Sequence, residues 1–312
     1  MKCLVTGGAG FIGSHLVDAL VKSGASVRVF DNLSTGFESN LADVRAGVDF
    51  VKDDVRDAES VRRACRDRDV VFHLAAMPSV PRSIEDPMTS FEVNVRGSCN
   101  VFAGARAEGV KRVVYSASSS AYGDTPTLPK IETMPPLPKS PYAADKLYGE
   151  MLARVYSTVY GMECAALRYF NIFGPRQRPD SAYAAVIPKF TAALVSGETP
   201  VIFGDGEQSR DFTFVANAVQ ANLKASRGEG LQGRVFNVGN GVRTTLNELL
   251  RLVAAELGLP PRVRYEPERL GDVKHSLADI GLARAAFGYE PAVSLAAGLK
   301  QTVAWFRSGP GA

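Results

Sequence analysis

The stretch VTGGAGFIG, residues 5–13, decides the fold of this 312-residue chain. It completes an apolar run, Lys2 to Thr6, that is typical of a buried parallel strand. The glycines at positions 7, 10 and 13 predict a tight turn that lets a pyrophosphate approach the main chain. A helix is expected from about Phe11 to Lys22, because its apolar side chains recur on one face. Its N-terminus would offer amides and a positive dipole end to phosphate.

The acid that ends the next strand indicates which dinucleotide this turn would hold. The strand Ser26 to Phe30 runs directly into Asp31. A carboxylate at this place accepts hydrogen bonds from an adenosine ribose and repels a 2′-phosphate, which favours NAD over NADP. Because strand, helix, strand and acid follow in this order, the sequence predicts a dinucleotide site rather than an ordinary tight turn.

A tyrosine and a lysine one helical turn apart form the second signature. Tyr142 and Lys146 follow Pro141, a residue that helices favour in their first turn. On its own the spacing also fits a surface tyrosine beside a solvated lysine. However, a serine cluster at 118–120 comes where the apolar strand 112–116 ends, and ligands bind at the carboxyl ends of parallel strands. A neighbouring ammonium and a nicotinium ring would lower the tyrosine pKa, so that it could act as a general base on an alcohol.

The order of the predicted elements gives the fold class. Strand and helix patterns alternate up to about residue 170, which predicts an α/β protein with a doubly wound parallel sheet, the Rossmann architecture. The expected strands are 2–6, 26–30, 48–52, 70–74, 112–116, 163–169 and, returning later, 235–239. The expected helices are 11–22, 87–108, 142–160, 182–196, 245–257 and 291–307, and the proline-rich stretch 125–140 is expected to be a surface loop.

The pattern changes after Asn171, which predicts a second, smaller α/β domain. We expect an NAD-binding domain in 1–171 plus about 213–242. The substrate domain would comprise about 172–212 and 243–312. A short strand at 201–203 belongs to this second part.

Composition narrows the function classes. The chain is 46% hydrophobic and 22% charged, as in ordinary globular proteins, and its net charge of +3 is too small to indicate a nucleic-acid partner. No apolar run reaches transmembrane length, and Met1-Lys2 leads straight into the first strand, so neither a membrane association nor a signal peptide is expected. Four isolated cysteines and three scattered histidines indicate no metal site and a cytoplasmic protein. His73 is interpreted as a packed strand residue.

Beyond the two signatures, a series of motifs along nearly the whole chain resembles one known family. They are Asp31-Asn32, Asp54-Val55, Leu74-Ala75-Ala76, Asn94, Leu167-Arg168-Tyr169-Phe170-Asn171, Gly204-Asp205-Gly206 and Arg210-Asp211-Phe212. Together with the glycine turn, the serine cluster and Tyr142/Lys146, they resemble the extended short-chain dehydrogenase/reductase family, and most closely its nucleotide-sugar 4-epimerase branch. The resemblance implies NAD as cofactor, a UDP-sugar as substrate and a homodimer formed through helices near 88–108 and 142–160.

The resemblance also implies which residues line the site. Those matching cofactor positions are Gly7, Gly10, Phe11, Ile12, Gly13, Asp31, Asn32, Ser34, Thr35, Gly36, Asp54, Val55, Leu74, Ala75, Ala76, Asn94, Tyr142, Lys146 and Tyr169. Those matching substrate positions are Ser119, Ser120, Asn171, Gln177, Ala185, Val186, Val201, Phe203, Arg210, Arg269, Asp272 and Ser276. Among these, Arg210 and Arg269 correspond to diphosphate contacts, Asp272 to a ribose contact, and Val201 and Phe203 to uracil contacts; Phe203 fits strand core equally well.

The residues before Tyr122-Gly123 discriminate between reactions within the family. Sugar 4,6-dehydratases resemble one another in carrying Asp-Glu there, and related decarboxylases carry a glutamate, whereas this chain has Ser119 and Ser120. Without that acid, no side chain is placed to expel the 6-hydroxyl, which favours epimerisation. In that reaction Tyr142 would remove the O4 proton, Ser118 would bind the same oxygen, and Lys146 would bind the nicotinamide ribose.

The substrate pocket favours an N-acetylated sugar. Ser276 stands where glucose-restricted epimerases resemble one another in having a tyrosine, and Gln177, Ala185 and Ser119 also match the N-acetyl branch, whereas Pro78 matches neither branch. We therefore expect UDP-GlcNAc and UDP-GalNAc as substrates, with UDP-Glc and UDP-Gal as weaker ones. Three alternatives stay open: a UDP-glucuronate 4-epimerase, a reductase that releases its product, and a catalytically silent NAD(H)-sensing protein.

Overall fold

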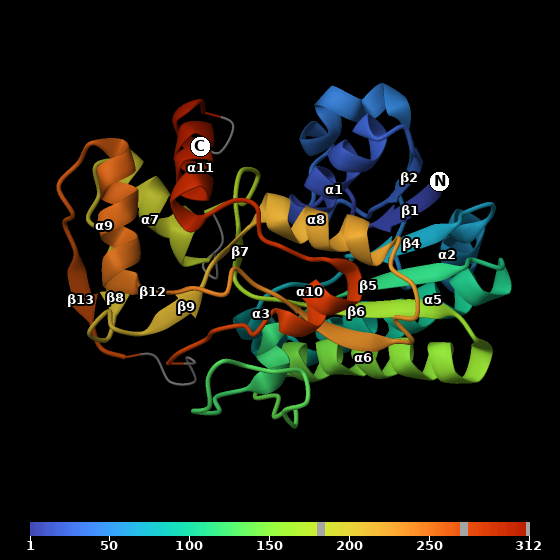
Figure 1. Ribbon diagram of the computed structural model, residues 1–312. Helices are drawn as coiled ribbons and strands as arrows, with labels where there is room; N and C mark the ends of the chain where they lie inside the picture. Colours follow the sequence, from blue (N-terminus) through green and yellow to red (C-terminus); the bar gives the residue numbers. More distant parts are fainter. Residues whose placement is uncertain (180–184, 269–273, 310–312) are drawn as a thin grey trace.

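A parallel sheet forms the centre of the computed structural model, which describes residues 1–179, 185–268 and 274–309. Within these ranges the sheet has seven strands in the order β11-β6-β5-β4-β1-β2-β3 (Figure 1). Most positions in the five inner strands are buried, which explains their continuous apolar sequences. The strands are β1 (Lys2–Thr6), β2 (Ser26–Phe30), β3 (Val48–Val51), β4 (Val70–His73), β5 (Arg112–Ser118), β6 (Glu163–Tyr169) and β11 (Arg234–Val238).

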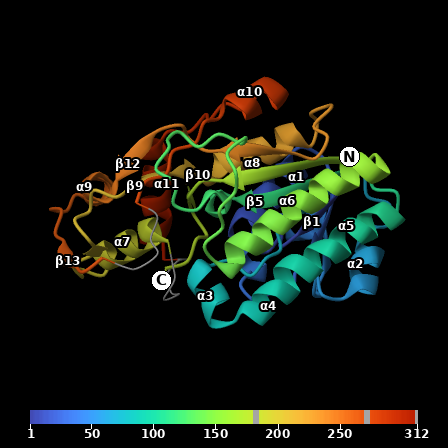
Figure 2. The same ribbon diagram turned by 90° about the horizontal axis from the view of Figure 1, so that it is seen from below.

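Helices cover both faces of the sheet, so the predicted doubly wound α/β class is confirmed (Figures 1 and 2). One face carries α1 (Phe11–Lys22), α8 (Val215–Ala225) and α10 (Gly281–Phe287), and the other carries α2 (Ala58–Cys65), α5 (Gly97–Ala107) and α6 (Pro141–Tyr160). A separate apolar cluster lies under each set. The strand order reverses between β1 and β4, and a parallel α/β sheet binds its ligand at such a switch point.

A third apolar cluster lies beyond the carboxyl ends of the strands. It is built from α7 (Val186–Val195), α9 (Leu246–Leu257) and α11 (Leu295–Arg307), which stand together on the left of Figure 1. Three two-stranded sheets accompany it: β7 (Ile172–Phe173) with β10 (Thr213–Phe214), β8 (Val201–Phe203) with β13 (Arg264–Glu266), and β9 (Ser209–Asp211) with β12 (Arg243–Thr245). The proposed division into two domains stays a prediction.

Most expected elements occur within two residues of their predicted bounds, but three expectations need correction. The helix expected over 87–108 is α4 (Pro87–Phe91), a π-helical turn η2 (Glu92–Arg96) and then α5. The last helix begins at Leu295, after its N-cap Ser294, and not at 291. The helix expected over 182–196 begins at Val186, because Ala185 is an extended N-cap, and 182–184 lie outside the described residues. Several elements were not expected, among them α2, α3 (Val80–Glu85), α8, α10 and the 3₁₀ turns η1 (Glu38–Gly47) and η3 (Ser119–Tyr122).

Candidate active site

The glycine turn leaves room for a phosphate group above the start of α1. Gly7 has φ +71°, and a Cβ added to it would lie 2.6 Å from the amide nitrogen of Ala75. A Cβ on Gly13 would lie 2.1 Å from the carbonyl oxygen of Gly7, so helix and turn are in direct contact. At Gly10, by contrast, it would approach only the carbonyl of Gly7, at 3.2 Å. The first-turn amides of Phe11 and Ile12 have no partner within the helix and suit a pyrophosphate.

Asp31 follows β2 directly and lies against the glycine turn. Its Oδ2 accepts a hydrogen bond from the Ala9 amide at 2.9 Å, and its Oδ1 accepts one from the Leu33 amide at 2.8 Å. Burial raises the pKa of this carboxyl group, although both hydrogen bonds act to lower it. The carboxylate oxygens can each accept a further hydrogen bond, so the residues present fit an NAD ribose.

The other predicted cofactor residues surround the turn. Asn32 donates to Asp54 at 2.8 Å, and the guanidinium of Arg56 lowers the pKa of Asp54 to about 2. Gly36 packs on the main chain of Ala9, next to the exposed Ser34 and Thr35. Val55 is buried, and Leu74, Ala75 and Ala76 follow β4 directly.

Asn94 and Tyr169 are both fully engaged with protein groups. The Asn94 side chain accepts from the amide of Met77 at 2.8 Å and donates to its carbonyl at 3.3 Å, which fixes the segment after β4. The Tyr169 hydroxyl accepts from Ser116 at 3.1 Å and from Asn222 at 2.7 Å. Asn94 therefore fixes main-chain groups of Met77, whereas Tyr169 is held by the side chains of Ser116 and Asn222.

The catalytic candidates come from two neighbouring elements, the end of β5 and the first turns of α6. Ser118 is the last residue of β5, and its Oγ accepts from the amide and hydroxyl of Ser120 at 3.2 and 2.9 Å. Helix α6 begins at an N-cap, Ser140, whose Oγ accepts from the Ala143 amide. Lys146 is buried and donates from Nζ to the carbonyl of Ser116 at 2.8 Å, so the lysine side chain bridges α6 and β5.

In the protein without NAD, burial decides the direction in which the pKa values of Tyr142 and Lys146 are shifted. Burial raises the pKa of the Tyr142 phenol above its usual value, and the neighbouring Ser118 hydroxyl acts in the opposite direction. Burial also lowers the pKa of Lys146 to about 8, so the ammonium form is less favoured than in water. The expectation of a lowered phenol pKa includes a bound nicotinium ring, so it stays a prediction for the NAD complex.

The predicted substrate residues gather between β6 and the third apolar cluster. The side chain of Asn171 donates to the carbonyl of Asp211 at 2.9 Å and to Ser276 Oγ at 3.3 Å. Arg210 donates to the carbonyls of Ser209 and Lys274, both at 3.1 Å. This pair of bonds joins β9 to the segment that carries Ser276.

The remaining substrate candidates lie on nearby elements. Gln177 donates to the carbonyl of Ile172 at 3.1 Å, and Ala185 is the N-cap of α7, next to Val186. Val201 and Phe203 are the half-buried ends of β8, on either side of the buried Ile202. Arg269 and Asp272 lie outside the described residues.

Several polar residues that the sequence analysis did not single out lie at this site. Asp211 is buried and accepts three main-chain hydrogen bonds, from Asn240, Gly241 and Ala278. It therefore joins three segments of the chain beside Arg210. The pair Glu150–Arg168 lies under the serine cluster and is treated below. Only the Arg-Asp-Phe and Leu-Arg-Tyr motifs pointed to these residues, without assigning them a role.

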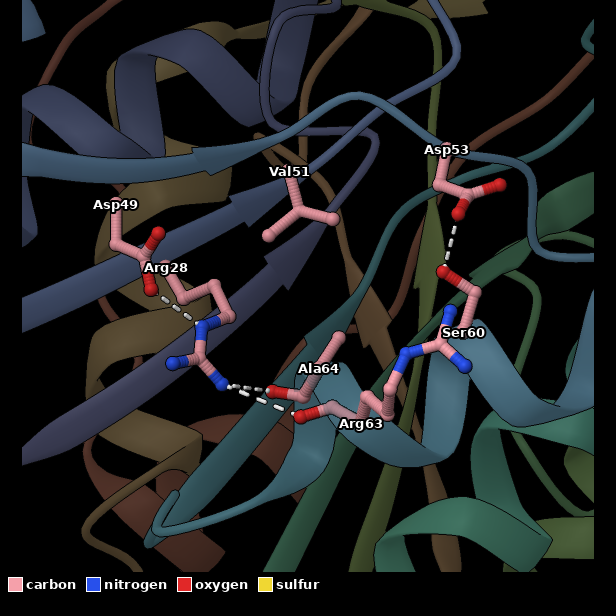
Figure 3. Close-up of a pocket in the computed structure, with 7 residues that line it drawn as sticks. All are labelled: Arg28, Asp49, Val51, Asp53, Ser60, Arg63 and Ala64. Atoms are coloured by element: carbon pink, nitrogen blue, oxygen red, sulfur yellow. Dashed lines mark hydrogen bonds and ion pairs between the residues drawn. The ribbon is translucent and has the colours of Figure 1, made fainter.

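A polar hollow of about 310 Å³ lies apart from these residues, between β2, β3 and α2 (Figure 3). Two polar pairs line it: Arg28 donates to Asp49 at 2.6 Å, and Ser60 donates to Asp53. We assign no function to it. His73 is buried in β4 and bonds Thr6 and Ser98, as a packed strand residue does.

No group of three or more His, Cys, Asp or Glu side chains among the described residues is placed to hold a metal ion. No helix among them is both long and apolar enough to cross a bilayer.

Comparison with known proteins agrees with this geometry. A UDP-glucose 4-epimerase of Mycolicibacterium smegmatis is 42% identical over 99% of both chains. The structure of a UDP-N-acetylglucosamine 4-epimerase from Methanobrevibacter ruminantium, in complex with UDP-N-acetylmuramic acid, is 42% identical with a TM-score of 0.94 and covers 98% of both chains. A Thermus thermophilus UDP-glucose 4-epimerase in complex with NAD is 38% identical with a TM-score of 0.91, over 99% of this chain and 100% of that one.

The sequence profile described as the NAD dependent epimerase/dehydratase family matches residues 3–239. This chain therefore belongs to the NAD-dependent epimerase/dehydratase family, within the extended short-chain dehydrogenases/reductases, and NAD is its cofactor.

Proposed function

We propose that the protein is an NAD-dependent 4-epimerase of UDP-sugars that interconverts UDP-GlcNAc and UDP-GalNAc, and more weakly UDP-Glc and UDP-Gal. The observation that carries the reaction type is the set Ser118, Tyr142 and Lys146 at the junction of β5 and α6, with no acid in the serine turn. The relatives that align end to end with the chain and bear the name 4-epimerase support the same reaction.

Each catalytic side chain has a distinct task in this proposal. Bound NAD supplies the hydride acceptor for C4 of the sugar and returns the hydride afterwards. Tyr142 removes the proton from the sugar O4 and later gives it back, and Ser118 hydrogen-bonds the same oxygen. Lys146 binds the nicotinamide ribose, and its ammonium favours the phenolate over the phenol. The positive nicotinium ring acts in the same direction and offsets the burial that raises the Tyr142 pKa.

The serine turn distinguishes epimerisation from elimination. Ser119 and Ser120 occupy the positions where dehydratases of the family have an acid. A hydroxyl group cannot expel the 6-hydroxyl as an acid does, so the 4-ketose stays intact and can accept the hydride on its other face.

The sugar preference rests on the small side chain at Ser276. It is half-buried beside Asn171, whose amide lies 3.3 Å from its hydroxyl. A tyrosine there would fill space that an acetamido group needs. The UDP-N-acetylglucosamine 4-epimerase from Methanobrevibacter, at 42% identity, supports this preference, whereas the name of the Mycolicibacterium relative supports glucose.

For the nucleotide, we assign the diphosphate to Arg210 and Arg269, the ribose to Asp272 and the uracil to Val201 and Phe203. Arginine suits a diphosphate because its planar fork makes paired hydrogen bonds. The position of Arg210 supports this assignment. Arg210 donates to the carbonyl of Lys274, and Asn171 donates to Ser276 in the same segment, so both side chains lie close to Ser276.

We also propose a homodimer, formed through the helical segments near 88–108 (α4, η2 and α5) and 142–160 (α6). An apolar stripe at helical spacing runs along the outer face of α6, where Met151, Val155 and Val159 are 53%, 47% and 63% exposed. Met88 and Phe91 on α4, which lies beside α6 in Figure 2, extend it. Patches of this kind on soluble proteins mark interaction sites. A Val155→Glu variant should sediment as a monomer where the wild type sediments as a dimer.

We assign the cytoplasm as its location, which suits four free thiols, three of them buried.

Proton NMR of the purified protein with single UDP-sugars tests this proposal. Growth of the UDP-GalNAc anomeric signal from UDP-GlcNAc, without added cofactor, would establish epimerisation, retained NAD and an acetamido-tolerant pocket. Conversion of UDP-Glc alone would keep the mechanism and overturn the reasoning from Ser276. Turnover of UDP-glucuronate alone would establish the alternative epimerase, and no turnover of any sugar with added NAD would favour a non-catalytic role.

A further inference from the structure

Tyr122 lies at the end of the 3₁₀ turn η3, directly after the serines, and polar groups hold it from two directions. Its side chain is buried, and its hydroxyl donates to Asn237 Oδ1 at 2.7 Å. The guanidinium carbon of Arg168 lies 4.4 Å from the centre of its ring, a cation–π contact. Both the position and the tilt of the ring are therefore fixed.

Arg168 is itself fixed by the helix that carries the catalytic tyrosine and lysine. Its Nε and Nη2 donate to the two carboxylate oxygens of Glu150 at 2.8 and 2.7 Å, and both side chains are at least 96% buried. Glu150 lies on α6, one turn after Lys146 and two turns after Tyr142. A continuous set of contacts therefore runs from the inner face of α6 to the serine turn.

Asn237, the other partner of Tyr122, is oriented by its own hydrogen bonds. Its side-chain Nδ2 donates to the carbonyls of Lys130 and Asp279, at 2.9 and 3.1 Å. Its main-chain amide donates to Glu132 at 2.7 Å. Because the amide hydrogens are used in this way, the Oδ1 atom must face the Tyr122 hydroxyl. The acceptor is thus pre-positioned on β11.

We propose that Tyr122 is a positioning residue for the epimerase reaction, held by Arg168 and Asn237 so that the serine turn stays at a fixed distance from Tyr142 on α6. The inference rests on the proposed roles of Ser118, Tyr142 and Lys146. Tyr122 acts through Ser118, whose Oγ is oriented by the amide and hydroxyl of Ser120, the residue two positions before Tyr122.

A consequence for the catalytic base follows. Ser118 and Tyr115 of β5 interact with the Tyr142 phenol, Ser83 of α3 accepts from the Tyr142 amide, and Lys146 lies one turn further along α6. Ser118 favours the phenolate, so a looser serine turn weakens that stabilisation. The acidic limb of the kcat profile then moves to higher pH, an effect that a purely structural role of Tyr122 would not produce.

The test is Tyr122→Phe, with Tyr289→Phe as its matched control. Phenylalanine keeps the ring over Arg168 and loses the bond to Asn237. Tyr289 is equally buried and donates a similar bond, to the carbonyl of Gly239 at 2.8 Å, away from the serine turn. We expect Tyr122→Phe to lower kcat about 10-fold, because small displacements of catalytic groups are costly, and to leave KM and bound NAD unchanged. The acidic limb of the pH profile of kcat should move to higher pH in Tyr122→Phe, whereas Tyr289→Phe should keep the wild-type kcat and pH profile.

Two outcomes would overturn the proposal: a wild-type profile and kcat for Tyr122→Phe, or equal losses in both variants, which would indicate lost stability alone. Hydrogen exchange of the wild-type holoenzyme gives a second test that depends on no variant. The amides of Ser120 and Gly123 should exchange as slowly as those of β5, and exchange as fast as in exposed loops would refute a fixed turn. Failure of the proposed function is a separate result, namely turnover that survives Tyr142→Phe.

Discussion

Replacing Lys146 by methionine should abolish activity and yet make the NAD-free protein more stable at neutral pH. Lys146 is 4% exposed, and burial lowers its pKa from 10.5 to about 8. That difference, at about 1.4 kcal/mol per pH unit, corresponds to about 3 kcal/mol of destabilisation while the lysine is charged. Methionine has a similar length and no charge, so it removes this cost.

The substitution also removes one hydrogen bond, the 2.8 Å bond from Nζ to the Ser116 carbonyl. Such a bond contributes about 1 kcal/mol, which leaves a net gain of about 2 kcal/mol for Lys146→Met at pH 7. The pH dependence has a definite sign. Between pH 8 and 10.5 the unfolded wild type binds more protons than the folded one, so wild-type stability rises with pH and the advantage of the variant disappears.

Urea unfolding of both NAD-free proteins at pH 7 and at pH 10 measures this difference, and the NMR assay measures turnover. Other groups that titrate in this range are common to both proteins and cancel in the comparison. Two results would contradict this reasoning: a variant that is less stable than wild type at pH 7, or a difference in stability that does not shrink as the pH rises. Either would show that burial of the charged Lys146 does not destabilise the protein.

Three further predictions concern chemistry and specificity. Tyr142→Phe removes the proton acceptor and should lower kcat by about 10³-fold with bound NAD unchanged in the absorbance spectrum, and appreciable turnover would exclude Tyr142 as the base. Asp31→Ser should weaken NAD binding and let NADP bind, since the carboxylate that repels a 2′-phosphate is gone; calorimetric titration that finds NADP still excluded would contradict this role. Ser276→Tyr should reduce kcat/KM for UDP-GlcNAc by about 10-fold or more and spare UDP-Glc, and equal losses on both sugars would sink the reasoning from pocket size.

The elements that the sequence predicted best are those bounded by strong local signals. Helix α1 begins after its N-cap Gly10 and ends at Lys22, as expected from the glycine turn before it and the apolar period within it. Helix α8 was not expected, because alanines and two asparagines make up most of its buried face and only Val215 and Val219 are larger apolar residues. Asn217 and Asn222 are buried there and bond the carbonyls of Val293 and Ala218, so the hydrophobic period is weak.

The site was predictable where one short motif supplies all the parts. The glycine turn and the Tyr142–Lys146 spacing are local, and the fold then brings Ser118 to them at the end of β5. The contacts of Arg168 were not predictable, because its partners Glu150 and Tyr122 lie 18 and 46 positions away and nothing in their spacing links them. The raised pKa of the Tyr142 phenol in the NAD-free protein was not predictable for a similar reason. Desolvation depends on all the elements that pack around the phenol.

The inner face of α6 carries polar residues at positions where apolar ones would be more stabilising. Tyr142, Lys146 and Glu150 follow one another at intervals of four, on the face that packs against β5 and β6, where a purely structural helix would carry apolar side chains. A buried ion pair such as Glu150–Arg168 is seldom more stabilising than well-packed apolar residues, and a buried lysine is destabilising while charged. At three successive turns the helix therefore has a polar side chain where an apolar one would pack better. The first two turns bear the proposed proton-transfer chemistry, and in our proposal the third sets the position of the serine turn opposite them. If that is correct, replacing the Glu150–Arg168 pair by apolar residues of similar volume should preserve stability while lowering kcat.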